Sequence, residues 1–245
     1  MDMYYWNFHS IRNSIVKSFN VRIQNFMTFF KKLWLNNKLF ILFILLMSVF
    51  RSAVADWYTV PTGSMQPTIK EGDRIIVNKM AYDLRIPFSQ FSLFTTGEPR
   101  RGEIVVFESK AANNRLIKRM IGLPGDVIAL KNETLYINGR PVSYQITKQN
   151  TQQLFATEIV DSITHTIRVD KSRSNQLSNF GPISVPDDHY IVLGDNRRNS
   201  ADSRVYGFVP RQELKGKATA IAFSLNYDNN YIPRKNRFFK DIYSI

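Results

Sequence analysis

The chain has 245 residues, 44% of them hydrophobic and 22% charged, a composition that excludes a disordered chain and a disulfide-stapled miniprotein. Because it contains no cysteine, a thiol nucleophile, a thiolate metal site and any disulfide are excluded as well. The formal net charge of +13 is compatible with binding to nucleic acid, with binding to anionic lipid, or with solubility alone. The histidines, His9, His165 and His189, form neither an H-E-x-x-H motif nor a close pair, so we expect no metal site.

Residues 1–34 are predicted to form a basic amphipathic arm. Up to residue 38 the chain has six basic side chains and a single acid, Asp2. Apolar side chains recur at spacings of three or four, typical of one stripe of a helix. They are Phe8, Ile11, Ile15, Phe19, Ile23, Phe26 and Phe30. Such a helix lies on an anionic membrane surface, or packs on a partner or on a second copy, and the sequence leaves these alternatives open.

An uncharged apolar run follows at residues 39–50. Twelve residues are too few by themselves, because the bilayer core requires about 20 predominantly apolar residues in a helix. The run becomes long enough when it is extended on both sides, with Trp34 and Trp57 at the two membrane interfaces. We therefore expect a single transmembrane helix over residues 35–58.

The charge asymmetry predicts the orientation of this helix. The basic arm is expected to remain in the cytoplasm, which leaves the chain after Tyr58 on the other side of the membrane. A competing interpretation is a secretory cleavage site, because Ala53-Val54-Ala55 before Asp56 has the small-x-small pattern. The long region before the apolar run and the charge on Arg51 favour the transmembrane helix.

Beyond residue 58 the pattern is typical of strands. Short β-branched runs separated by glycine and proline occur at 74–79, 103–108, 115–122, 126–131, 189–194 and 218–223. Asn138-Gly139 between two such runs is a strong hairpin signal. We therefore predict a mainly β domain.

The boundaries of this domain follow from composition. Residues 142–181 are richer in polar side chains and are predicted to form an inserted, variable β lobe. The β domain is then made of residues 59–141 and 182–225, and residues 226–245 are expected to form a C-terminal tail.

Three polar, turn-rich segments, 61–68, 118–126 and 194–204, carry the side chains that could perform chemistry. Each alone has an ordinary structural explanation, as a tight turn or a surface ion pair. A serine nucleophile such as Ser64 requires a base, and a lysine acts as one only where burial lowers its pKa from about 10.4. Lys118 lies among apolar neighbours, although a strand lysine pointing into water is the simpler alternative.

Together these segments resemble the motif boxes of bacterial type I signal peptidases, membrane-anchored Ser/Lys proteases that remove signal peptides. The matching motifs are T-G-S-M-Q-P-T at 62–68, G-D-R-I-I-V-N-K at 72–79, R-G-E-I-V-V-F at 101–107, K-R-M-I-G-L-P-G-D at 118–126 and G-D-N-R-R-N-S-A-D-S-R at 194–204. The resemblance covers residues 57–223 and implies an antiparallel β catalytic domain behind a transmembrane helix. It does not extend to the 142–181 lobe or to either terminus.

The resemblance implies a catalytic role for three residues. Ser64 is expected to be the nucleophile, and Lys118 the general base that takes its proton and later activates the deacylating water. The backbone N–H of Ser64 and the hydroxyl of Thr62 are expected to form the oxyanion hole. No cofactor is implied.

The same resemblance implies supporting and binding roles. Ser200 is expected to hydrogen-bond and orient the Lys118 amine, and Asp202 is expected to form an ion pair with Arg204. An extended substrate is expected between residues 57–61 and 115–118 as an added strand. The residues implied to line pockets for small side chains at the −1 and −3 positions are Tyr58, Val60 and Ile117.

The implied location is the bacterial inner (cytoplasmic) membrane, with a single span and the catalytic domain on the periplasmic side. The implied partners are signal peptides of secreted preproteins and the phospholipid membrane, and no nucleic acid. This chain departs from some members of the family in two respects. It has one clear apolar run where some members have two membrane spans, and its lobe lacks the cysteines that some members have.

Two other functions remain open from the sequence. Self-cleaving repressor-type proteins also use a Ser/Lys pair, but they carry a DNA-binding module where this chain has an apolar run. A membrane-tethered β-rich binding protein would leave the joint presence of Ser64, Lys118 and the 194–204 motif unexplained. Nucleic-acid binding is disfavoured because no RNA-binding or zinc-finger motif is present.

Overall fold

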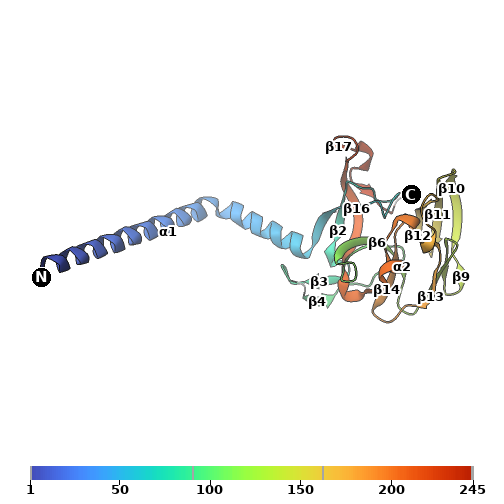
Figure 1. Ribbon diagram of the computed structural model, residues 1–245, viewed down its shortest axis with the longest axis horizontal. Coiled ribbons are helices and arrows are strands. Elements are labelled where there is room, and N and C mark those ends of the chain that lie inside the picture. The colour runs from blue at the N-terminus through green and yellow to red at the C-terminus, as the bar shows by residue number, and fades with distance from the viewer. Residues whose placement is uncertain (1, 90, 162, 244–245) are drawn as a thin grey trace. The chain divides into compact units, whose positions relative to one another are not determined.

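The structure is a computed structural model that describes residues 2–89, 91–161 and 163–243 (Figure 1). The chain forms two compact units, Met1–Phe50 and Arg51–Ile245, called unit 1 and unit 2 below. Unit 1 is helical, whereas unit 2 consists mainly of antiparallel strands. The predicted mainly β fold behind an N-terminal apolar helix is thus confirmed.

Helix α1 spans Asp2–Ala53, so the predicted arm from residue 2 onward and residues 35–53 of the predicted membrane segment form one uninterrupted helix. Within it, Val16–Ala53 is long and apolar enough to cross a membrane, which is consistent with a single-pass anchor. The polar side chain in the apolar run is satisfied locally, because the Ser48 hydroxyl donates to the Ile44 carbonyl.

The C-terminal end of this helix differs from the prediction. Residues 55–58 were expected to be helical, but strand β1 begins at Ala55 and runs to Thr59. The physical reason is pairing: all five residues of β1 lie opposite β2, with Ala55 opposite Asn78 and Thr59 opposite Arg74. The predicted helix end was based only on the run of apolar residues, which does not reveal that residues 55–59 form hydrogen bonds with β2.

Unit 2 contains eighteen strands and one short helix among the described residues. In chain order they are β1 Ala55–Thr59, β2 Asp73–Asn78, β3 Asp83–Arg85, β4 Ser92–Thr95, β5 Ile104–Ser109, β6 Asn114–Gly122, β7 Val127–Lys131, β8 Thr134–Ile137, β9 Arg140–Pro141, β10 Ser143–Gln149, β11 Gln153–Val160, β12 Ile163–Asp170, β13 Phe180–Ser184, β14 His189–Leu193, α2 Ser203–Tyr206, β15 Val209–Pro210, β16 Leu214–Asn226, β17 Ile232–Pro233 and β18 Lys240–Asp241.

The main sheet has the strand order β1-β2-β16-β5-β6-β14-β15, with β17 and β18 also paired to β16. Inward side chains alternate along its strands, as in β2, where Ile75 and Val77 are fully buried and Arg74 and Ile76 are not. β1 forms one edge of this sheet. The loop after this edge strand carries the first of the polar segments, residues 61–68.

Two further sheets form the rest of unit 2. One joins β10, β11 and β12, and the other has the order β13-β7-β8-β9. The sequence suggested a single inserted lobe over residues 142–181, whereas the structure divides this stretch. Residues 143–170 form the three-stranded sheet, and β13 pairs with β7 from the preceding part of the chain.

The C-terminal residues belong to the β domain and are not a separate tail. Ile242 is buried in the same apolar cluster as Met65 and Ile69 of the loop after β1. The Tyr243 hydroxyl donates to the Ala218 carbonyl and accepts from the Ile104 amide. Composition did not predict this packing, because residues 226–245 are rich in polar and charged side chains whose partners lie far away in sequence.

Candidate active site

Ser64 lies on the loop that connects β1 with β2, called the nucleophile loop below and comprising residues 60–72. Met65 and Ile69 anchor this loop by burying their side chains in the core, while Ser64 itself is half-buried. Asn196 fixes the loop from the other side: its backbone amide donates to the Ser64 carbonyl at 3.0 Å, and its side chain donates to the Gly63 carbonyl at 3.0 Å. The position of Ser64 is therefore set by contacts on both sides of its loop.

Lys118 lies on β6, and its amine reaches the serine. The distance from Lys118 Nζ to Ser64 Oγ is 2.9 Å, and Nζ also donates to the Ile117 carbonyl at 3.0 Å. The lysine is only 3% exposed. Burial lowers its pKa from 10.5 to about 8, although Asp202 and Asp195 oppose this shift. A neutral amine in contact with a serine hydroxyl can accept that hydroxyl's proton.

The segment 194–204 packs against these two residues through a tight backbone approach. A Cβ on Gly194 would lie 2.2 Å from Ser200 Oγ and 2.6 Å from the Ser64 carbonyl oxygen. Only glycine allows this approach, because any side chain would displace either the serine or the nucleophile loop. The glycine therefore brings Ser200 close to Ser64.

Asp202 and Arg204 form the expected ion pair, at 2.7 Å, and both side chains are buried. The Asp202 carboxylate also accepts from the Gly194 amide at 2.9 Å. Burial alone would raise the pKa of Asp202, but the Arg204 guanidinium bonded to it lowers that pKa below its ordinary value. The pair fixes the turn that carries Ser200.

Two further residues were predicted to support catalysis, Ser200 as a hydrogen-bond partner of Lys118 and Thr62 as a donor to the oxyanion. Ser200 is buried, but among the described residues its hydroxyl makes no hydrogen bond to Lys118. Thr62 is exposed on the nucleophile loop, two residues before Ser64. Its hydroxyl is therefore accessible to a substrate from solvent.

The residues predicted to bind substrate converge at one place. Val60 is buried in the cluster that contains Met65, and Tyr58 and Ile117 pack against the same cluster. The Arg115 guanidinium lies 4.3 Å from the centre of the Tyr58 ring. β1 and β6 are separated by three strands in the sheet order, so this contact shows that the sheet curves until they face each other.

The facing edges of β1 and β6 are unpaired in the part of the chain that the structure describes. β1 pairs only with β2, and β14 pairs with β6 only at residues 119, 120 and 122. Residues 115–118 of β6 therefore pair with β5 alone. An extended peptide can add to such edges by main-chain hydrogen bonds.

A buried ion-pair network lies behind the nucleophile loop, and the sequence did not assign it. Arg119 donates from Nε and Nη2 to both carboxylate oxygens of Asp195, at 2.8 and 2.7 Å, and Thr68 donates to the same carboxylate at 2.6 Å. His165 Nε2 lies 3.1 Å from a Glu158 oxygen, and Glu158 also pairs with Arg197. The sequence offered two signals for this network: Arg119 directly follows Lys118, and Asp195 lies in the G-D-N motif. Because Arg119 and Asp195 are 76 positions apart, local spacing does not predict that they pair.

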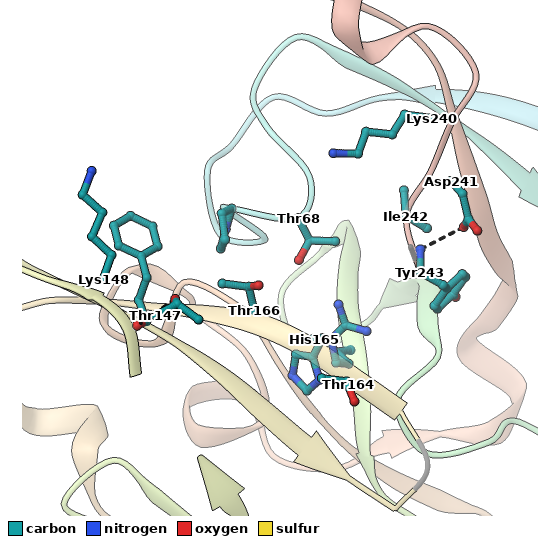
Figure 2. Close-up of a pocket in the computed structure, with 13 residues that line it drawn as sticks. Thr68, Thr147, Lys148, Thr164, His165, Thr166, Lys240, Asp241, Ile242 and Tyr243 are labelled. Carbon is teal, nitrogen blue, oxygen red and sulfur yellow. Dashed lines mark hydrogen bonds between the residues drawn. The ribbon is translucent and has the colours of Figure 1, made fainter. Parts of the chain in front are cut away.

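A pocket of about 440 Å³ lies beside the nucleophile loop. Figure 2 shows Thr68 of this loop, residues 164–166 of β12 and residues 240–243 of the C-terminal segment around it. Arg168 of β12 donates to the Gln66 side chain at 2.7 Å, and Arg237 donates to the Thr68 carbonyl at 3.0 Å. The nucleophile loop is thus held between β12 and the C-terminal segment.

Known proteins match this chain over most of its length. The profile of the family described as signal peptidase, peptidase S26, matches residues 33–223. A signal peptidase I of Pseudomonas fluorescens is 36% identical over 200 residues, which cover 75% of this chain and 69% of the relative. Signal peptidase I P of Bacillus subtilis subsp. natto is 32% identical over 190 residues, which cover 77% of this chain and 88% of the relative.

A solved structure also matches. The crystal structure of a signal peptidase I from Enterococcus faecalis aligns with 49% of this chain and 96% of that chain, at 32% identity and a TM-score of 0.32. The family profile and the sequence relatives together decide the assignment. The chain belongs to the signal peptidase family, peptidase S26, and is a serine endopeptidase of the class that removes signal peptides.

Proposed function

We propose that Ser64 and Lys118 form the catalytic dyad with which this enzyme cleaves preproteins. The observation that carries the proposal is the 2.9 Å distance between Lys118 Nζ and Ser64 Oγ, at a lysine whose pKa burial lowers to about 8. At that pKa an appreciable fraction of the amine is neutral near neutral pH, so it can serve as a base without histidine.

The reaction runs through an acyl-enzyme. Ser64 Oγ attacks the scissile carbonyl carbon while the neutral amine of Lys118 takes the hydroxyl proton, which then passes to the leaving amine nitrogen as the C–N bond breaks. Water attacks the resulting ester, Lys118 accepts a proton from that water, and the proton returns to Ser64 Oγ as the acyl group leaves. The scheme requires no metal and no cofactor.

Neighbouring groups stabilise the charges that develop. The Ser64 amide and the Thr62 hydroxyl are the proposed donors to the oxyanion, and removing one such donor typically costs about 10²–10³ in rate. Ser200 is proposed to orient the Lys118 amine once substrate is bound. The pair of Asp202 and Arg204 positions the turn that carries Ser200.

The substrate is proposed to bind as an extended strand between the unpaired edges of β1 and β6. Val60, which is buried, and Tyr58 and Ile117, which are partly buried, would then form shallow apolar walls around the side chains before the cleaved bond. Shallow walls admit small residues at −1 and −3 and exclude large ones sterically.

The enzyme is proposed to be a single-pass protein of the bacterial inner membrane with unit 2 on the periplasmic side. The support is the stretch Val16–Ala53, which is apolar enough to cross a membrane, and the six basic residues against one acid in residues 1–38, before the uncharged run at 39–50. Only ten residues separate Ala53 from Ser64, which keeps the dyad within reach of the bilayer surface, where a signal peptide emerges.

Cleavage of a preprotein with an Ala-x-Ala site by the detergent-solubilised full chain tests this proposal. Wild type is compared with Ser64→Ala and Lys118→Ala, and product termini are identified by mass spectrometry. Cleavage after the final alanine by wild type alone is the expected result. Equal cleavage by the variants would mean that other residues act, and no cleavage by folded wild type would favour a binding protein.

A further inference from the structure

The hydrogen bond from Asn196 to the nucleophile loop ends on the peptide group that precedes Ser64. Asn196 Nδ2 donates to the Gly63 carbonyl at 3.0 Å, and the Gln66 amide donates to the same oxygen at 3.1 Å. A carbonyl oxygen has two lone pairs, so both are occupied here. Donors from two segments of the chain therefore hold the Gly63 carbonyl in one direction.

The Gly63 carbonyl and the Ser64 N–H belong to one planar peptide group. The bond between these residues is trans, so its C=O and N–H point in opposite directions. Among the described residues, no acceptor takes a hydrogen bond from the Ser64 amide, so this N–H is available to a ligand. Because Asn196 is buried, a carbonyl turned toward it leaves the N–H turned away from the buried side.

The turn that Asn196 begins does not explain its side chain. Asn196 directly precedes the short 3-10 turn Arg197–Asn199, where an asparagine side chain commonly accepts from the first N–H groups. Here the side chain makes no such cap. It reaches Gly63 instead, 133 positions away in the sequence. The contact with the nucleophile loop therefore accounts for the direction of this side chain.

The other half of the Asn196 amide is left without a partner. Asn196 is only 2% exposed, and its Oδ1 accepts no hydrogen bond from any residue that the structure describes. The Gly63 oxygen can only accept, so Nδ2 and not Oδ1 must face it. A buried acceptor without a donor costs free energy. The chain keeps this cost at a residue whose Nδ2 holds the peptide group before the nucleophile.

Strand β12 supports both donors to the Gly63 carbonyl. Arg168 of β12 forms an isolated β-bridge with Asn196, and its amide donates to the Asp195 carbonyl at 2.8 Å. Its guanidinium donates to the Gln66 side chain at 2.7 Å. The segments that carry Asn196 and Gln66 are thus connected to one strand, which gives the rigid support that a preorganised donor requires.

We propose that Asn196 is a positioning residue that directs the Ser64 N–H at the developing oxyanion. By donating to the Gly63 carbonyl it also polarises the shared peptide group, which makes the N–H a stronger donor as negative charge develops. Asn196 acts through Gly63 and does not contact the substrate. The inference rests on the proposed function, in which the Ser64 amide donates to the oxyanion.

Asn196→Leu in the detergent-solubilised full chain removes the donor and keeps the branched shape of the side chain. For preprotein cleavage, kcat should fall by about tenfold to a hundredfold while KM stays within about twofold, because only a transition-state contact is weakened. The matched control is Asn175→Leu. Asn175 also precedes a 3-10 turn that its side chain does not cap, but it is exposed, so both constants should equal those of wild type.

A peptide aldehyde with an Ala-x-Ala sequence gives a readout that a merely structural role would not change. Ser64 Oγ adds to its carbonyl carbon, the serine proton passes to Lys118, and the former carbonyl oxygen takes the place of the oxyanion. The matching peptide alcohol binds without forming this bond. Asn196→Leu should weaken inhibition by the aldehyde about as much as it lowers kcat, and inhibition by the alcohol by less than about twofold.

Three outcomes would overturn the inference: a wild-type kcat in Asn196→Leu, an unchanged inhibition constant for the aldehyde, or an equal weakening of aldehyde, alcohol and KM. The last outcome would assign Asn196 to the fold of the binding groove. If the bulk of leucine lowers the melting temperature by more than about 5 °C, Asn196→Asp replaces it. Aspartate has nearly the same size but no N–H, so the same split between aldehyde and alcohol is expected.

Failure of this inference is distinguishable from failure of the proposed function. If Ser64→Ala or Lys118→Ala cleaves as well as wild type, the proposed dyad is wrong, and the role of Asn196 fails with it. If cleavage depends on both residues but the aldehyde inhibits wild type and Asn196→Leu equally, the dyad stands and the positioning role of Asn196 alone is wrong.

Discussion

Lys118 and Arg119 are consecutive residues of β6 whose side chains point to opposite faces of the strand, and both are buried. Arg119 is 1% exposed and bonds both oxygens of Asp195, and its third nitrogen donates to the Gly102 carbonyl at 2.7 Å. Lys118 is 3% exposed and has no ion pair in the described part of the chain. The same degree of burial thus produces two different electrostatic states.

The difference shows what a partner does for a buried cation. Burial alone would raise the pKa of Asp195, but the Arg119 guanidinium lowers it below its ordinary value, so the Asp195 carboxylate stays charged. At Lys118 burial is not offset by a bonded carboxylate, and the pKa falls to about 8. The paired cation is therefore structural, and the unpaired one is available for proton transfer.

Removing the unpaired cation should have the largest effect on activity. Lys118→Met should lower kcat/KM by about 10⁴ or more, because Ser64 then has no base, while the fold is retained because the two side chains are similar in length. The measurement is preprotein cleavage together with thermal unfolding. The matched control is Lys131→Met, which removes an exposed strand lysine. Residual activity of Lys118→Met above about 1% of wild type would contradict the assignment of Lys118 as the base.

Removing the paired cation should instead affect stability. Arg119→Met leaves the buried Asp195 carboxylate without its guanidinium partner, which should reduce the free energy of unfolding by about 3–5 kcal/mol. Urea unfolding of the detergent-solubilised chain measures this loss. The matched control is Arg140→Met, because Arg140 is exposed, and it should change the free energy of unfolding by less than about 0.5 kcal/mol. If Arg119→Met caused an equally small loss, the ion pair with Asp195 would not be needed for stability.

The pH dependence of cleavage should report the state of Lys118. The amine must be neutral to act, and its folded-state pKa is lowered to about 8. The value of kcat/KM should therefore rise about tenfold per pH unit below pH 8 and level off above it. A rise that continued well beyond pH 9 would indicate a lysine with its ordinary pKa of 10.5.

Asp202→Asn should have the smallest effect on activity, although it leaves the buried Arg204 guanidinium without its carboxylate and should lower the free energy of unfolding. Asp202 is the strongest influence that raises the pKa of Lys118, so its neutralisation should move the rising limb of the pH profile toward lower pH. The amide keeps an acceptor for the Gly194 amide, so plateau activity should remain within about tenfold of wild type. A limb that moved toward higher pH would show that Asp202 does not act on Lys118 through its charge.

The residues of the candidate site were predictable because short sequence segments resemble the signal peptidase motifs. The Ser64, Lys118 and 194–204 segments are local patterns, and β-branched runs indicated β6, which carries Lys118, and the strands that precede or follow the other two segments. The ion pair of Asp202 and Arg204 was also predictable, since the two residues are two positions apart. Local spacing suffices where the interacting groups are neighbours in the chain.

Contacts between distant segments were not predictable in the same way. The pair of Arg119 and Asp195 and the packing of Ile242 on the nucleophile loop join residues that no periodicity relates. The end of α1 at Ala53 was missed because β1 pairs with β2 across a loop of 13 residues. In each case the deciding energy comes from a partner that a single sequence does not identify.

The sequence by itself determined a mainly β protein with an apolar N-terminal helix, and its resemblance to the signal peptidase motifs singled out the candidate nucleophile and base. These properties depend on residue type and local spacing, which a chain carries whether or not it is folded. Only the tertiary structure decided that Lys118 is buried without an ion pair and lies 2.9 Å from Ser64. It also decided that Arg119 forms an ion pair with Asp195, because burial and distance arise only when strands from different parts of the chain pack together.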